Sequence, residues 1–206
     1  MIEKLESILD NEVNKYLTEI KEKKEVKDLV SGEIEKDTYV KFLKTFYLIE
    51  FLSQRAVNMA SIYTEEKYPY LSKKFHSCAV GELGHAEIAL KDLKDMGEDI
   101  DDPFKNSLVK EYDRFLQKEA ENFPLSILGH SYLFENVSGT LFPESGDISF
   151  PSRFIKVHAK EDPGHSIAIK RTVRNIEDNL DQHEIEKIIQ FSRKSGDYLL
   201  KLFETA

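Results

Sequence analysis

Apolar side chains recur at helical spacing through almost the whole sequence, and few residues interrupt them. Six prolines and nine glycines occur in 206 residues, so long segments can continue without a break. No stretch alternates apolar and polar residues as a half-buried strand does. The predicted helices cover residues 2–22, 36–64, 69–96, 103–123, 124–142, 151–178 and 183–204. We therefore expect an all-α protein with about seven helices packed in one bundle.

The expected helices follow one another without a linker long enough to separate two domains. The sequence contains no internal repeat and no low-complexity tract. Hydrophobic residues make up 40% of the chain and charged residues 33%, a balance that is typical of a globular protein and not of a disordered one. Residues 1–206 are therefore expected to form a single domain with a substantial core.

The acidic net charge of the chain limits the classes of partner that it can bind. The formal net charge is −9 and no basic run interrupts the acidic background, which argues against nucleic acid and anionic membranes. No run approaches the roughly 18 apolar residues of a membrane-spanning helix, and the charged N-terminus does not resemble a signal peptide. The one cysteine, Cys78, excludes an internal disulfide and fits a reducing compartment. We expect a soluble, cytoplasmic protein.

Three polar residues near the C-terminal third share one face of a predicted helix. His158, Asp162 and His165 stand at i, i+4 and i+7, so their directions differ by roughly 60° at most. Phe154 and Ile169 extend the same face, which predicts that it points inward. Buried polar groups of this kind are costly unless they are compensated, and a metal ion would compensate them. The alternative is a solvated, charged turn.

Polar residues also interrupt the apolar faces of three other predicted helices. Glu82 and His85 stand at i and i+3, the spacing by which helical bundles present a carboxylate and an imidazole to one metal. Glu135 lies in a strongly apolar segment, where an ionised carboxylate needs a partner. Glu50 is flanked by apolar residues on both sides; its alternative is pairing with Arg55 or with a tyrosine hydroxyl.

These candidates together form a ligand set without thiolate. They are Glu50, Glu82, His85, Glu135, His158, Asp162 and His165. Mixed carboxylate and imidazole ligation suits iron, with manganese as a second choice. Four carboxylates balance two divalent ions, so we expect two Fe(II) per chain and no catalytic group beyond the ligands. Pro163 lies inside the last motif and predicts a kinked or loosened helix there, a segment that would become ordered when metal binds.

Three of these motifs resemble the heme-oxygenase-like di-iron oxidases, also called iron-containing redox enzymes. The resemblance rests on Glu82-Leu-Gly-His85, on Tyr132-Leu-Phe-Glu135 and on His158-x3-Asp162-x2-His165, which occur in the family's order over residues 40–170. Glu50 would match the family's first-helix glutamate by its position. The resemblance implies a heme-oxygenase-like fold and an Fe(II) enzyme that activates O2.

The resemblance also implies the kind of substrate. Members of the family oxidise small molecules such as fatty acids, amino acids and aminobenzoate precursors, so a small molecule and O2 are the expected partners. An apolar pocket would hold the substrate, and we expect its walls to include Phe46, Tyr47, Tyr132 and Phe142. A homodimer is common among bundles of this type.

Three other functions compete with this interpretation. A true heme oxygenase needs a proximal histidine on its first helix, yet no histidine precedes His76. A cofactor-free enzyme similar to TenA or to PQQ synthase needs no metal; a thiaminase of this type needs a nucleophilic cysteine, and Cys78 is the one candidate, although we expect it to be a packing residue. In a non-enzymatic interaction protein, the ligand candidates would diverge in space. We expect His76 and His130 to be structural or to line the pocket, and not to be ligands, and we expect His183 to be exposed.

Overall fold

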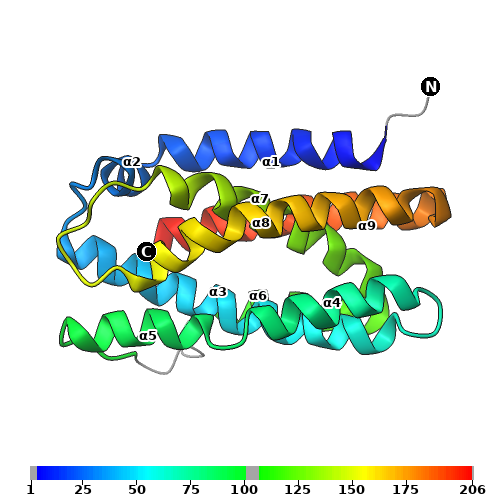
Figure 1. Ribbon diagram of the computed structural model, residues 1–206, viewed down its shortest axis with the longest axis horizontal. Coiled ribbons are helices and arrows are strands. Elements are labelled where there is room, and N and C mark those ends of the chain that lie inside the picture. Colours follow the sequence, from blue (N-terminus) through cyan, green and yellow to red (C-terminus); the bar gives the residue numbers. More distant parts are fainter. Residues whose placement is uncertain (1–3, 101–106, 206) are drawn as a thin grey trace.

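The computed structural model describes residues 4–100 and 107–205, which form helices joined by short turns (Figure 1). The α-helices are α1 (Leu5–Glu22), α2 (Lys24–Ser31), α3 (Lys36–Tyr63), α4 (Pro69–Gly81), α5 (His85–Asp95), α6 (Ser107–Asn122), α7 (Ile127–Leu141), α8 (Arg153–Ile176) and α9 (Gln182–Thr205). No strand occurs in the described ranges. The predicted all-α class is confirmed. Within these ranges, no helix combines the length and apolar character that crossing a bilayer requires.

The helices differ from the predicted ones at two places. The helix expected over residues 69–96 is divided into α4 and α5 by a turn at Glu82–Gly84, because Gly84 adopts φ +95°, a left-handed conformation that ends a helix. The short helix α2 was not expected, and Gly32 ends it in the same way with φ +77°. The N-terminal part of the helix expected over 103–123 lies outside the described residues, and α6 forms the rest.

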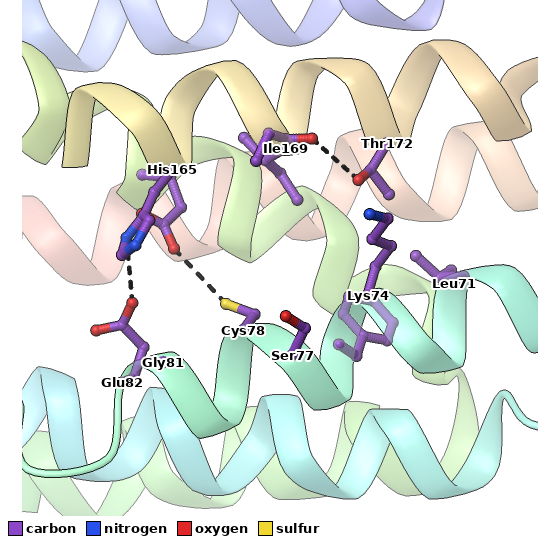
Figure 2. A pocket seen from close by; sticks show the side chains of 12 residues that line it. Leu71, Lys74, Ser77, Cys78, Gly81, Glu82, His165, Ile169 and Thr172 are labelled. Atoms are coloured by element: carbon purple, nitrogen blue, oxygen red, sulfur yellow. Dashed lines mark hydrogen bonds and ion pairs between the residues drawn. The ribbon is translucent and has the colours of Figure 1, made fainter. Parts of the chain in front are cut away.

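The long helices lie roughly along one axis (Figure 1). α7 packs against both α8 and α9, whereas α3 packs against α4, α5 and α6. In Figure 1, α1 lies along one side of the bundle, and α4 and α5 lie along the opposite side. α4 and α8 face each other, with side chains of both helices between them (Figure 2). This arrangement places α3, α4, α5, α7 and α8 around one region of the interior.

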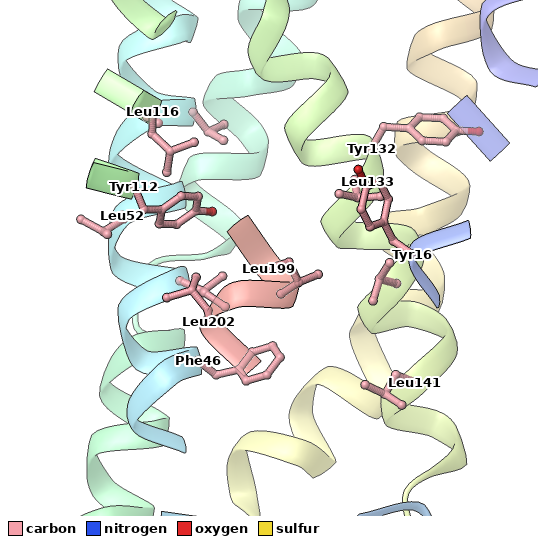
Figure 3. Close-up of a cluster of buried hydrophobic side chains, with 14 of the residues drawn as sticks. Tyr16, Phe46, Leu52, Tyr112, Leu116, Tyr132, Leu133, Leu141, Leu199 and Leu202 are labelled. Atoms are coloured by element: carbon pink, nitrogen blue, oxygen red, sulfur yellow. The ribbon is translucent and has the colours of Figure 1, made fainter. Parts of the chain in front are cut away.

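An aromatic cluster holds one end of α8 against the core. The ring centroid of Phe154 lies 5.8 Å from that of Phe46 and 5.9 Å from that of Phe142. Figure 3 shows Leu199 and Leu202 of α9 beside Phe46. Each of these side chains is almost fully buried, and burying one such side chain contributes about 1.5–3 kcal/mol. Because Phe154 is one helical turn before His158, this packing fixes where the ligand motif begins.

A buried carboxylate fixes the same end of α8 to α5. Asp92 is fully buried, and its Oδ2 accepts a hydrogen bond from the backbone N–H of Phe154 at 2.9 Å. Its Oδ1 accepts a second from Arg153 Nη1 at 2.8 Å. The first-turn N–H groups of a helix have no partner within the helix, so Asp92 caps α8 from a neighbouring helix.

Candidate metal centre

The structure brings all seven predicted ligands to one place. Donor atoms within 4.8 Å of one another form a first group of Glu50, Glu82, His85 and His158 and a second group of Glu135, Asp162 and His165; a third set, Cys78 with Glu82 and Glu135, overlaps both. α3 supplies Glu50, the end of α4 supplies Glu82, α5 supplies His85, α7 supplies Glu135 and α8 supplies the other three. Residues as far apart in sequence as 50 and 165 thus converge, which does not fit a protein whose acidic residues are merely solvated.

Glu82 lies between the two groups. Its Oε2 is 2.6 Å from Nδ1 of His85 in the first group, and its Oε1 is 3.3 Å from Nδ1 of His165 in the second. Figure 2 shows Glu82 at the end of α4 facing His165 of α8. Glu82 and His85 were expected on one helix, yet they stand on either side of the turn that Gly84 allows. That turn, and not helical periodicity, turns both side chains inward.

Further contacts hold each group together. In the second group, His165 Nδ1 lies 3.4 Å from Glu135 Oε2 and 3.8 Å from Asp162 Oδ1. In the first group, His158 Nε2 lies 3.6 Å from Glu50 Oε1, and the His85 and His158 ring centroids are 4.7 Å apart. In these contacts a carboxylate oxygen faces an imidazole nitrogen, and the Glu50 and Glu135 contacts each join two helices.

Four buried atoms of the two groups have no aligned hydrogen bond among the described residues. They are His85 Nδ1, His158 Nε2, His165 Nδ1 and Asp162 Oδ2. A buried polar atom without a partner costs about 1–3 kcal/mol. The three histidine nitrogens face carboxylate oxygens of the site, so cations bound by these donors would satisfy them. This donor set, with no thiolate in either group, fits divalent iron or manganese.

Burial and neighbouring charges shift the pKa values of several residues in the two groups. Burial raises the pKa of Asp162 to about 7, and it raises the pKa of Glu135 as well. Burial alone would lower the pKa of His158, but Glu50 beside it raises that pKa to about 9. Contact with Glu135 outweighs burial for His165 and raises its pKa to about 9. The carboxylates therefore hold positive charge in their midst, and a metal cation would take the place of those protons.

Two neighbouring cavities reach the groups, and Cys78, Glu82 and Glu135 line both. The larger, about 300 Å³, lies between α4 and α8 and reaches Glu82, Glu135 and His165 (Figure 2). Its remaining walls are mainly apolar and are formed by Leu71, Lys74, Phe75, Ser77, Cys78, Gly81, Ala168, Ile169 and Thr172. The smaller, about 60 Å³, reaches Glu50, His158 and Asp162 and contains several hydroxyl groups. The larger cavity has the size and character of a small-molecule site.

Of the four predicted pocket walls, one lines a cavity at the site. Phe46 lines the smaller cavity, but Tyr47, Tyr132 and Phe142 line neither of the two. Tyr132 points towards α1, where its hydroxyl donates to Asp10 Oδ1 at 2.7 Å (Figure 3). Tyr47 stacks on Phe51 with ring centroids 6.5 Å apart. Phe142 belongs to the core cluster, with its centroid 5.4 Å from that of His158.

Helical spacing in the sequence does indicate the residues that line the larger cavity. On α4, Leu71, Phe75, Cys78 and Glu82 follow at spacings of four, three and four residues, so they share one helix face. On α8, the ligand face simply continues through Ile169 to Thr172.

The helix α8 continues through Pro163 without interruption, so no break appears at the ligand motif.

Of the other histidines, His130 and His183 are placed as expected, whereas His76 is not. His130 is buried, and its two ring nitrogens lie 3.0 Å from Ser53 Oγ and 3.2 Å from Ser195 Oγ. His76 and His183 are exposed. Cys78 lines both cavities, and its Sγ lies 3.7 Å from Glu135 Oε1. Burial raises the pKa of the Cys78 thiol well above its usual value, so the thiol stays protonated at neutral pH.

No protein-family model matches the sequence, and no curated protein matches it either. Solved structures do match. A domain of unknown function with a heme oxygenase-like fold from Shewanella denitrificans superposes with a TM-score of 0.81 at 18% identity, over 100% of this chain and 92% of that one. A TenA homologue from Pyrococcus furiosus gives 0.80 at 13% identity, over 97% and 98%. A TenA homologue from P. horikoshii gives 0.72 at 16% identity, over 98% of both chains. The chain therefore has the heme-oxygenase-like fold that these proteins share.

Proposed function

We propose that the protein is a non-heme, O2-activating oxidase or oxygenase that binds two metal ions, iron(II) before manganese, and acts on a small molecule. One observation supports the proposal most: two groups of partly or fully buried donors meet at Glu82, and four of their atoms have no aligned hydrogen bond. Glu50, His85 and His158 would bind one ion with Glu82, and Glu135, Asp162 and His165 would bind the other. Two ferrous ions would supply the electrons and the binding position for O2.

The chain itself would hold and orient the reactants. The ligands come from five helices whose packing fixes their spacing, so the site is ordered before substrate arrives. The apolar walls of the larger cavity would keep water from the reacting atoms. His165 stands at the boundary between this cavity and the second group, and its side chain is 33% exposed. A substrate in the cavity would therefore lie directly against the second group.

The larger cavity indicates what kind of small molecule fits. Leu71, Phe75 and Ile169 give it apolar walls, whereas Lys74 contributes a cation. Lys74 Nζ lies 5.5 Å from the centroid of the Tyr70 ring, and no acidic side chain in the described residues forms an ion pair with it. We infer a substrate with an apolar body and an anionic group, in which the anion contacts Lys74 and the body extends towards His165.

A second candidate function is a cofactor-free enzyme of the TenA type. It draws support from the fold shared with two TenA homologues and from Cys78, whose thiol lies in the cavity wall 3.7 Å from Glu135. In that case Glu135 would accept the thiol proton and Cys78 would be the nucleophile. The four buried atoms without partners would then have no role.

Oxygen uptake separates the two candidates. Protein loaded anaerobically with Fe(II) is mixed with O2, with and without alkyl and aromatic carboxylates, and uptake is followed with an oxygen electrode. We expect iron-dependent uptake that His158→Ala and His165→Ala abolish. Metal-free protein that hydrolyses thiamine, with activity lost in Cys78→Ser, would establish the second candidate instead. A Soret absorption band after reconstitution with heme, together with heme degradation, would refute both.

A further inference from the structure

The three imidazoles of the site each turn one particular nitrogen towards the other donors. For His158 this is Nε2, because Nδ1 lies 2.8 Å from the backbone carbonyl of Phe154 and donates its proton there. A histidine that donates one N–H to a carbonyl keeps its other nitrogen free as a ligand. His158 therefore has its tautomer fixed by its own helix, one turn earlier.

His85 shows the opposite arrangement. Its Nδ1 lies 2.6 Å from Glu82 Oε2, is buried and has no aligned hydrogen bond. Its Nε2 lies 3.6 Å from Oε2 of Glu161. No backbone carbonyl is bonded to either ring nitrogen of His85 in the described residues. The carboxylate of Glu161 is thus the group that faces the outer nitrogen.

Glu161 lies beside the site and outside both donor groups. It follows Lys160 on α8 and its side chain is 44% exposed, whereas its neighbour Asp162 is buried and points into the second group. The distance of 3.6 Å is longer than an N–H···O bond of about 2.7–3.2 Å. Because the Glu161 side chain is 44% exposed, a small rotation about its torsions would bring the two atoms within that range.

We propose that Glu161 is a positioning residue for His85: it accepts the Nε2 proton, fixes the ring orientation and leaves Nδ1 to bind the metal. This inference rests on the proposed metal centre and adds a residue from outside its donor set. Carboxylate partners of ligand histidines are a recurrent device, and their removal lowers metal affinity about 10–100-fold. Because Glu161 is partly exposed, its removal leaves no buried charge and should not affect folding.

Calorimetric titration with Co(II) tests the proposal without any measurement of activity. Glu161→Ala should bind one of the two ions about 10–100-fold more weakly and leave the other unchanged. Glu161→Gln should fall between this variant and wild type, because an amide oxygen still accepts the Nε2 proton. Glu87→Gln is the matched control: it removes one exposed carboxylate from α5, two residues after His85, and should bind both ions as wild type does.

Proton NMR of the Co(II)-loaded protein gives the second readout. A ligand imidazole shows a hyperfine-shifted N–H signal, and the His85 signal, assigned by its loss in His85→Gln, should exchange faster with solvent in Glu161→Ala. Wild-type affinity for both ions and an unchanged signal in that variant would overturn the role of Glu161 alone. A wild-type protein that binds no ion would overturn the metal centre, and this inference with it.

Discussion

Two glycines close to the site should respond in opposite ways to the same substitution. Gly139 on α7 faces α8: a methyl group there would lie 2.9 Å from the carbonyl oxygen of Asp162 and would also meet Ser166 Oγ. Backbone cannot rotate away from such a contact. Ser166 could rotate, but its Oγ donates to the Glu135 carbonyl at 2.5 Å. Gly139→Ala therefore forces α7 and α8 apart between two predicted ligands.

The magnitude follows from three terms. Overpacking costs about 1–3 kcal/mol, and loss of the Ser166 hydrogen bond adds about 1 kcal/mol. The higher helix propensity of alanine returns about 1 kcal/mol. We therefore expect a net loss of about 1–3 kcal/mol in the free energy of unfolding, the sum of these terms. Urea denaturation followed by circular dichroism at 222 nm measures this free energy.

Gly164→Ala is the matched control on α8. No atom lies within 4 Å of a methyl group at this position, and the residue is helical without a positive φ. The same substitution should therefore stabilise the protein by about 0.4–1 kcal/mol. Equal stabilisation of the two variants would refute the close approach of α7 and α8 at the site.

Three further predictions concern the fold and the cavity. Asp92→Ala should destabilise the protein by about 1–3 kcal/mol, because the Phe154 N–H loses its partner. The control is Asp95→Ala, which removes the other and more exposed ion-pair partner of Arg153. It should cost less than about 1 kcal/mol in the same urea titration. Burial lowers the pKa of His130 to about 3, against about 6.5 in an unfolded chain. Between these two pH values the unfolded state binds a proton that the folded state does not bind. The free energy of unfolding should therefore fall as the pH drops from about 6.5 towards 3, by up to about 1.4 kcal/mol per pH unit. His130→Gln should remove that component of the pH dependence, and an unchanged slope would contradict the buried, neutral state. Lys74→Met should weaken binding of an alkyl carboxylate about tenfold in calorimetry, the loss of one charge-assisted contact; an equal loss for the neutral amide of the same chain would argue against an ion pair.

The candidate ligands can be picked out from the sequence because they break a simple rule. Glu50, Glu135 and His158 are polar residues on faces that are otherwise apolar, and helical periodicity identifies such residues wherever the helix is long. The same periodicity predicted the all-α class. Helical periodicity is a local property of the sequence, so these predictions do not require knowing which helices are in contact.

Other features depended on contacts that periodicity does not contain. The turn that separates Glu82 from His85 depends on the left-handed conformation of Gly84. A glycine inside a helical pattern does not by itself predict such a turn. Tyr132 lies only about 60° around α7 from Glu135, yet it contacts Asp10 of α1 and not the cavity. Asp92 is buried because α8 packs against it and supplies its partners, Arg153 and the Phe154 N–H. In each case the outcome was set by the neighbouring helix.

The number of metal ions bound per chain tests the central claim most directly. Protein purified anaerobically is titrated with Fe(II), unbound metal is removed by gel filtration, and iron and protein are measured in the same fractions. Two irons per chain are expected, with fewer in His158→Ala, in His165→Ala and in Glu82→Gln, the last of which should affect both ions because Glu82 faces both groups. Circular dichroism should show all three variants folded. Protein that retains no metal, with the same thermal stability in the presence and absence of Fe(II), would contradict the account.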